Sequence, residues 1–206
     1  MRIHKAKARK QYPCRKCSDP IEAGQEYLWY KHRYRPKVKF HTKHGYPRPS
    51  ELTTSDKLFE LYGAREALED AISEIQGQGF EPEVPENQEM DDGDILLELL
   101  DRINAALDDL GAAVDEAVET AGSVADGYEE SADNVEEYFG ETEQVSNMRD
   151  NADQIREWID ALESVDLSDR PSAAQGEDLE TSISVAQEFI ESKIEELEGA
   201  IGELNL

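Results

Sequence analysis

Residues 94–139, DILLELLDRINAALDDLGAAVDEAVETAGSVADGYEESADNVEEYF, carry the pattern that decides the fold of this 206-residue chain. Apolar residues recur in it with alternating spacings of four and three, which places them on one face of an α-helix. Six heptads in phase predict a coiled-coil or bundle helix, roughly 70 Å long at 1.5 Å per residue. The positions on this face are Leu96, Leu100, Ile103, Leu107, Leu110, Val114, Ala117, Ala121, Val124, Tyr128, Ser131, Val135 and Tyr138.

Further helices are predicted on both sides of this segment. Residues 51–77 have the apolar spacing of a connecting helix, and residues 78–93, with two prolines and several acids, read as a linker. After Gly140 two shorter helices follow, and in the first of them Trp158 lies beside the apolar stripe. No single helix buries enough apolar surface to be stable alone, so residues 94–206 are expected to form an acidic helical bundle or coiled coil. The apolar positions of the last two helices are Val145, Met148, Ala152, Ile155, Ile159 and Leu162, and then Leu179, Ile183, Ala186, Ile190, Ile194, Leu197, Ile201 and Leu204.

Charge divides the chain into two segments. Residues 1–58 contain 15 Lys and Arg against 5 Asp and Glu, a net charge of +10. Residues 59–206 contain 6 against 43, a net charge of −37, and Lys193 is the single lysine there. An asymmetry of this size indicates segments with different roles. A lysine-poor acidic surface also suits molar salt, where repulsion is screened within roughly 3 Å, so a halophilic origin is one explanation. A disordered acidic tail and a mimic of nucleic-acid charge are the others.

Composition and motifs narrow the classes of function. No apolar run approaches the roughly 20 residues that cross a bilayer, and the basic start, MRIHKAKARK, is not followed by the apolar stretch of a secretory signal. We therefore expect a cytoplasmic protein of a host cell, or one associated with a virus. The chain has no phosphate-binding glycine loop, no H-E-x-x-H and no nucleophile elbow, so we expect no enzymatic activity.

A pair of cysteines and a pair of histidines near the start of the chain predict a structural zinc site. Cys14 and Cys17 form a C-x2-C pair, and His41 and His44 form an H-x2-H pair. Zinc takes four such ligands in a tetrahedron, and a closed set leaves no open position for catalysis. The basic module of residues 1–50 is too small to be stabilised by an apolar core alone. A bound metal would explain how it folds. The cysteines could instead form a redox pair, the histidines could face phosphate, and His32 could replace either histidine ligand.

These residues also resemble known families. The N-terminal part resembles treble-clef zinc fingers, in particular those of the poly(ADP-ribose) polymerase type, although this chain has a histidine as its last ligand and a shorter insert. That resemblance implies a zinc ion and contact with DNA. It is carried by Cys14-x2-Cys17, Ile21-x2-Gly24-x2-Tyr27, Trp29 and His41-x2-His44.

The whole chain resembles a family of phage- and prophage-encoded proteins, which implies a viral or mobile-element setting. The resemblance covers the N-terminal third and residues 148–166 best. It is carried by Ala8-Arg9-Lys10-x-Tyr12-Pro13, Tyr27-x-Trp29-Tyr30-Lys31, Pro47-Arg48-Pro49-Ser50-x-Leu52-Thr53 and Trp158-Ile159-x-Ala161-Leu162-Glu163.

Basic residues interleaved with aromatic ones predict where a partner binds. Phosphate neutralisation combined with base stacking is what nucleic acid requires of a protein surface. The same surface could instead pair with the chain's own acidic helices or with an acidic protein. The residues that we expect to contact nucleic acid are Arg9, Lys10, Arg15, Lys16, Trp29, Arg33, Tyr34, Arg35, Lys37 and Lys39.

Taken together, the sequence predicts a mainly α-helical protein with a small zinc-stapled β-hairpin module at its start. The module is expected to contact nucleic acid or a nucleoprotein, and the acidic helices are expected to space it or to oligomerise. One alternative is a virus-associated scaffold that assembles through its helices. Another is an inhibitor that offers its acidic helices as a decoy to a nucleic-acid-binding enzyme. A membrane or a small-molecule substrate is not expected.

Overall fold

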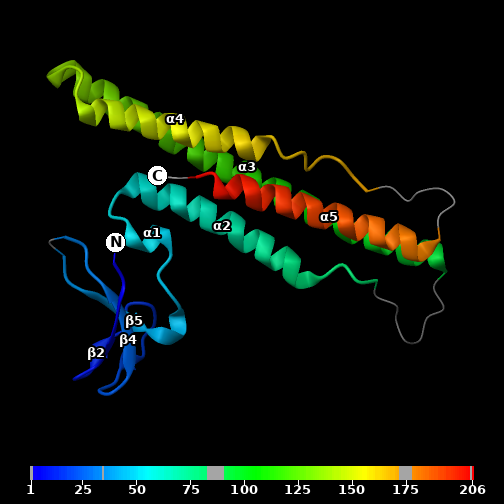
Figure 1. Cartoon of the computed structure of the whole chain (residues 1–206), viewed down its shortest axis with the longest axis horizontal. Coiled ribbons are helices and arrows are strands. Elements are labelled where there is room, and N and C mark those ends of the chain that lie inside the picture. Colours follow the sequence, from blue (N-terminus) through cyan, green and yellow to red (C-terminus); the bar gives the residue numbers. More distant parts are fainter. Residues whose placement is uncertain (1, 34, 83–90, 172–177, 205) are drawn as a thin grey trace. The chain divides into compact units, whose positions relative to one another are not determined.

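The structure is a computed structural model that describes residues 2–33, 35–82, 91–171, 178–204 and 206 (Figure 1). It contains two compact units, Met1–Tyr62 and Gly63–Leu206. The boundary falls inside helix α2 (Asp56–Gln78), which corresponds to the predicted connecting helix. Of the predicted linker 78–93, residues 83–90 lie outside the described residues. The helices of the described ranges contain no stretch apolar and long enough to cross a membrane.

A three-stranded antiparallel sheet forms the centre of the first unit. Its strands are β1 (His4–Lys7), β4 (Glu26–Tyr30) and β5 (Val38–His41), in the order β1-β4-β5. Strands β4 and β5 form a hairpin, as predicted for this module, and they are rich in the aromatic and β-branched residues that favour strands. Strand β1 was not predicted, because its sequence His-Lys-Ala-Lys lacks the apolar alternation that marks a strand. Its residues alternate between half-buried and exposed at the edge of the sheet.

Shorter elements surround this sheet. Strands β2 (Tyr12–Pro13) and β3 (Pro20–Ile21) form a two-stranded ladder, and the 3-10 helix η1 (Thr42–His44) follows β5 directly. A one-turn helix, α1 (Pro49–Leu52), then begins at Pro49. Proline is well suited to the first position of a helix, because its fixed φ fits the helix and its missing N–H would have no partner there. Arg48, which precedes it, is extended, with φ −72° and ψ 160°.

Each face of the three-stranded sheet carries a small apolar cluster. Tyr27 lies on one face with Ala8 and Ile21, and the neighbouring residue Leu28 lies on the other with Tyr30 and Phe40. Successive residues of a strand point to opposite faces, so a single five-residue strand serves both clusters. Two clusters of three buried residues each are a small core for a unit of this length.

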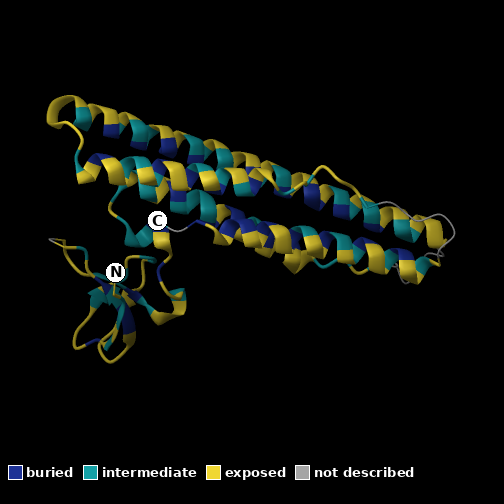
Figure 2. Ribbon diagram, turned by 45° about the horizontal axis from the view of Figure 1, so that its top comes forward, coloured by how far each residue is buried: buried dark blue, intermediate teal, exposed yellow. Residues whose placement is uncertain are grey.

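Three long helices form most of the second unit. They are α3 (Asp92–Phe139), α4 (Glu143–Glu163) and α5 (Leu179–Gly202), and α3 packs against both of the others. In Figure 2 their buried residues form stripes along inward faces, whereas the outward faces are exposed. The side chains of Asp91, Thr142 and Asp178 cap the three N-termini by accepting a backbone N–H.

The central part of the predicted α3 stripe is confirmed. Every predicted position from Ile103 to Tyr128 is buried, but at the ends the buried residues are Leu99 and Ala132, and Tyr138 is 77% exposed. A straight helix repeats every 3.6 residues, so a strict heptad seam drifts across its surface by about 20° per heptad. The buried face is also wider than a two-position seam because two helices pack against it, and it includes Ala106 and Ala125.

The α4 stripe differs from its prediction at Met148 and at Ile159, which are both only half-buried. Trp158 is 1% exposed and lies in the core, whereas Ile159 is only half-buried. The other buried residues of α4 are Val145, Ala152, Ile155 and Leu162. The spacing from Ile155 to Trp158 to Leu162 continues the alternation of three and four, and a buried tryptophan in this series adds a large apolar area to the core.

Arginines join the helices of the acidic unit. Arg149 and Arg156 reach from α4 to carboxylates of α3, and Arg170 reaches Asp108. Arg102 donates to the carbonyl oxygens of Gly79 and Glu81, and Arg65 donates to that of Leu204. All five arginines of this unit therefore bond to a segment other than their own, in a region where acids greatly outnumber bases.

Replacing Arg156 by glutamine is expected to lower the urea midpoint for unfolding of this unit at about 0.1 M salt, and to lower it less at about 2 M salt, where charges are screened. The guanidinium lies 2.6 Å from Glu129 and 3.4 Å from Asp126, so its loss leaves acids facing one another across α3 and α4. Urea unfolding followed by helical circular dichroism measures the difference.

Lys193→Gln is the matched control for this prediction. Lys193 pairs with Glu196 within its own helix, so its loss should cost only a few tenths of a kcal/mol. Equal losses for the two variants, or a loss at Arg156 that salt does not reduce, would contradict the role of Arg156 as a link between helices.

Candidate metal centre

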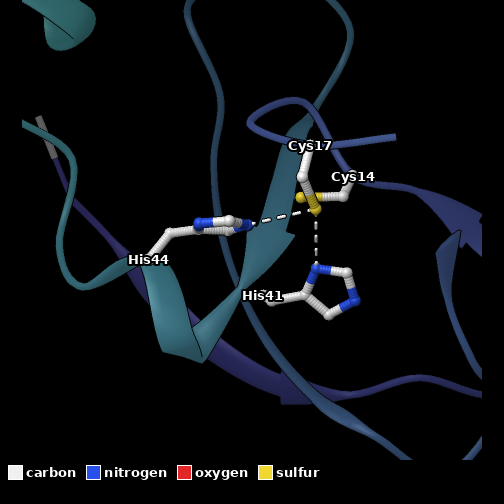
Figure 3. A group of neighbouring side chains, drawn as sticks. All are labelled: Cys14, Cys17, His41 and His44. Carbon is white, nitrogen blue, oxygen red and sulfur yellow. Dashed lines mark hydrogen bonds between the residues drawn. The ribbon is translucent and has the colours of Figure 1, made fainter. Parts of the chain in front are cut away.

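The two predicted ligand pairs converge at one end of the β5 strand (Figure 3). Cys14 follows β2, Cys17 lies in the turn before β3, His41 ends β5 and His44 ends η1. One ligand atom from each of the four residues lies within 4.8 Å of all the others. The sequence prediction of this set is therefore confirmed as a group of side chains that could bind a metal.

The distances within the group suit tetrahedral coordination. The Cys17 Sγ lies 3.5 Å from His41 Nδ1 and 3.3 Å from His44 Nε2. With metal–sulfur bonds near 2.3 Å and metal–nitrogen bonds near 2.05 Å, a tetrahedron has a sulfur–nitrogen edge of about 3.6 Å. The two distances from Cys17 to the histidines are therefore close to the edges of a tetrahedral site.

A backbone carbonyl fixes the orientation of the His41 ring. The Nε2 of His41 lies 3.2 Å from the carbonyl oxygen of Pro20. Because a carbonyl can only accept, Nε2 carries the proton and donates it, which leaves the Nδ1 lone pair facing Cys17. Metal-binding histidines commonly have such a partner, since it selects the tautomer that binds the metal. The sequence did not indicate Pro20, because its contribution comes from its backbone.

The two thiols differ in acidity. Burial acts to raise the pKa of Cys14, but donation by the backbone N–H groups of His41, Lys16 and Cys17 outweighs it and lowers that pKa to about 6. Burial raises the pKa of Cys17, and its hydrogen bond with Cys14 adds to the effect. At neutral pH the pair therefore holds one thiolate and one thiol, and binding of a metal by both sulfurs would release the remaining proton.

The site also joins the parts of the module. Cys14 packs against both apolar clusters, one on each face of the sheet. The backbone N–H of Arg15 donates to the carbonyl of Lys39 at 2.9 Å, which attaches the cysteine turn to the edge of β5. A metal at this point would link β5 and η1 to the turn between β2 and β3.

The other two histidines lie outside this group. His32, which the sequence offered as a substitute ligand, packs edge-on against Tyr30 with ring centroids 5.4 Å apart. His4 stacks on Trp29 at 4.3 Å, and the sequence gave no indication of that contact because β1 was not predicted.

Three lysines and two aromatic residues of the first unit form one surface, which we call the lysine–aromatic surface. It consists of Tyr12, Trp29, Lys10, Lys37 and Lys39. Lys39 Nζ lies 3.3 Å from the centroid of the Tyr12 ring, and Lys37 Nζ lies 3.7 Å from that of Trp29. Burial lowers the pKa of Lys39, and the charges of Lys37 and Lys10 lower it further. The contact between Tyr12 and Lys39 depends on the fold and could not be predicted from spacing.

The remaining predicted contact residues are spread more widely. Arg9 is exposed after β1, and Arg33 and Arg35 are exposed in the loop between β4 and β5. Arg15 is exposed beside the cysteine turn. Lys16 is half-buried and pairs with Glu51 at 2.7 Å. Tyr34 lies outside the described residues.

Comparison with protein-family models, with curated proteins and with solved structures gives no match for this chain.

Proposed function

We propose that residues 1–62 form a module stapled by a structural zinc ion, that this module binds nucleic acid or a nucleoprotein, and that the acidic helices space it from other parts of an assembly. The convergence of Cys14, Cys17, His41 and His44 is the observation that supports the proposal most directly. In this proposal the module binds a partner and has no catalytic role.

The donor set favours zinc over other metals. Two thiolates and two imidazoles in a tetrahedral arrangement are typical of structural zinc, whereas magnesium and calcium prefer oxygen ligands. Four protein ligands also fill the coordination sphere, so no position remains for a reacting water. The ion would hold the turn that presents Arg15 and the strand that presents Lys39 in a fixed relation.

The charges of the module favour an anionic partner. Three of its few acids already pair with lysines, since Glu26 pairs with Lys5, Glu51 with Lys16 and Asp19 with Lys43. The lysine–aromatic surface gathers three ammonium groups that form no ion pair among the described residues. A phosphate backbone would relieve the repulsion between these groups, and aromatic rings lie beneath two of them.

The helices are proposed to act as a spacer within one chain. The heptad pattern of α3 is typical of coiled coils, but α4 and α5 already cover its apolar face. This packing favours an intramolecular bundle over a scaffold that assembles through the same face. The acidic outer surface and the resemblance to phage proteins are both compatible with a virus-associated protein from a high-salt cytoplasm.

The zinc-loaded full-length protein is expected to bind a short single-stranded oligonucleotide, such as a fluorescein-labelled (dT)12, with an affinity that falls steeply as salt rises. Fluorescence anisotropy at several salt concentrations measures this. Replacing Lys10, Lys37 and Lys39 together by glutamine should reduce the slope of log K against log salt by about 2, at about 0.7 for each lost phosphate contact.

The matched control replaces Lys5, Lys7 and Lys31, which lie outside the lysine–aromatic surface, by glutamine. This variant loses the same charge but should keep the slope of the unmodified protein. Binding that is independent of salt, or a control variant as impaired as the test variant, would refute the proposed surface.

A further inference from the structure

The first unit contains a pocket of about 810 Å3 beside the outer edge of β5. Its described lining comes from three segments far apart in the sequence, with Arg15 in the first, Arg35 and Val38 in the second, and Thr54 and Phe59 in the third. Its volume is within the range of small-molecule sites, which are mostly apolar with a few placed polar groups. We propose that this pocket binds one nucleotide unit of a single-stranded nucleic acid.

Two arginines supply the phosphate-binding groups of the pocket. Arg15 is held on one side, because its backbone N–H bonds to Lys39, and Arg35 is held on the other, because its backbone N–H bonds to the carbonyl of His32 at 3.1 Å. Both side chains are exposed, and neither forms an ion pair within the described part of the chain. Guanidinium groups bind phosphate through paired N–H donors, so two arginines whose backbones are anchored beside the pocket suit a phosphodiester.

The walls of the pocket suit a flat base. Phe59 lines it and is 58% exposed, although a phenyl ring of this size usually lies in a core. Pro36 and Val38 add apolar surface, and base–aromatic stacking tolerates any base. Asp56 is the single carboxylate of the described lining, and it can accept a hydrogen bond from a ring or exocyclic N–H of a base.

Lys37 and Lys39 connect the pocket to the lysine–aromatic surface. Both residues border the pocket, while their ammonium groups lie over Trp29 and Tyr12. A single-stranded nucleic acid could therefore place one base against Phe59, and the phosphates next to that base could lie along these lysines. This inference rests on the proposed function and adds the place where a single nucleotide is held.

Thymidine 5′-monophosphate, thymidine and inorganic phosphate, each titrated into the isotope-labelled, zinc-loaded full-length protein, test the inference. The nucleotide should shift backbone NMR signals of Arg35, Thr54 and Phe59, and it should bind at least about ten-fold more tightly than either fragment. Arg35→Gln and Phe59→Ala should each weaken its binding by about ten-fold. Both positions are exposed, and retained zinc content checks that these variants are folded.

Arg2→Gln is the matched control, since Arg2 is exposed and does not line the pocket. It should change nucleotide affinity by less than about two-fold. If (dT)12 binds but the nucleotide shifts no pocket signal and neither pocket variant matters, the pocket inference is wrong and the proposed function stands. If the nucleotide binds in the pocket but (dT)12 does not bind, the proposed function fails, and the pocket is a site for a free nucleotide and not for a unit of a strand.

Discussion

Removing the proposed zinc ion from the full-length protein is expected to unfold residues 1–62 while α3, α4 and α5 persist. The chain has two tryptophans, Trp29 in the first unit and Trp158 in the second. In a Trp158→Phe background, Trp29 fluorescence should therefore change on addition of a strong chelator. Helical circular dichroism should change little, because the first unit contributes few helical residues.

The size of this effect follows from the small core of the module. Six buried apolar residues in two clusters cannot offset the conformational entropy of some 60 residues, at about 1–2 kcal/mol for each backbone unit. Structural zinc contributes about 10–16 kcal/mol in zinc-finger peptides at neutral pH. Without the ion we expect the unfolded form of this unit to dominate.

The same conclusion can be tested by substitution. Cys17→Ser should abolish binding of the expected one zinc per chain, whereas His32→Ala should leave it intact, because His32 lies outside the ligand group. Metal analysis by mass spectrometry on purified protein gives the stoichiometry. A metal-free protein whose first unit keeps the NMR dispersion of the loaded form would show that the ion is not a staple.

Trp158→Ala is expected to cost about 3–5 kcal/mol of the free energy of unfolding of the helical unit, the largest loss for one side chain of this unit. The indole is 1% exposed and is the largest fully buried side chain of the protein as described. Its removal would leave a cavity beside Ile155 and Leu162, which cannot fill it. Urea unfolding at constant salt, followed by circular dichroism, measures the loss.

Two companion variants make this a test of the α4 register. Ile159→Ala should cost clearly less than Trp158→Ala, since Ile159 is only half-buried. Trp158→Phe should change the free energy of unfolding by less than about 1 kcal/mol. The phenyl ring loses contact area, but the substitution also removes a buried indole N–H that has no hydrogen-bond partner in the described structure. A greater loss at Ile159 than at Trp158 would support the register suggested by the heptad spacing alone.

The parts of the structure that the sequence predicted depend on local spacing. The ligand group could be recognised because each pair lies within four residues, so that a single turn presents both members. The central α3 stripe could be recognised because a 3.5-residue pattern and a 3.6-residue helix agree over a few heptads. The hairpin of β4 and β5 could be predicted from the sequence because these strands are rich in aromatic and β-branched residues, which contribute to the two apolar clusters.

The parts that the sequence did not predict depend on tertiary contacts. Strand β1 is polar and exists because β4 offers it an edge, with His4 opposite Trp29. The choice of Trp158 over Ile159 depends on where α3 and α5 lie. The pocket draws on residues from 13 to 59, and no spacing rule connects Arg15, Arg35 and Phe59.

The placement of the four ligands has a consequence for how proteins of this design can diversify. A metal bound by these ligands would hold the turn at Cys14 and Cys17 against the segment at His41 and His44, and the loop between β4 and β5 contains none of the four ligands. Insertions or exchanges within residues 31–37 would leave every ligand in place. Changes in that loop could therefore alter which partner is bound without altering the residues that stabilise the fold.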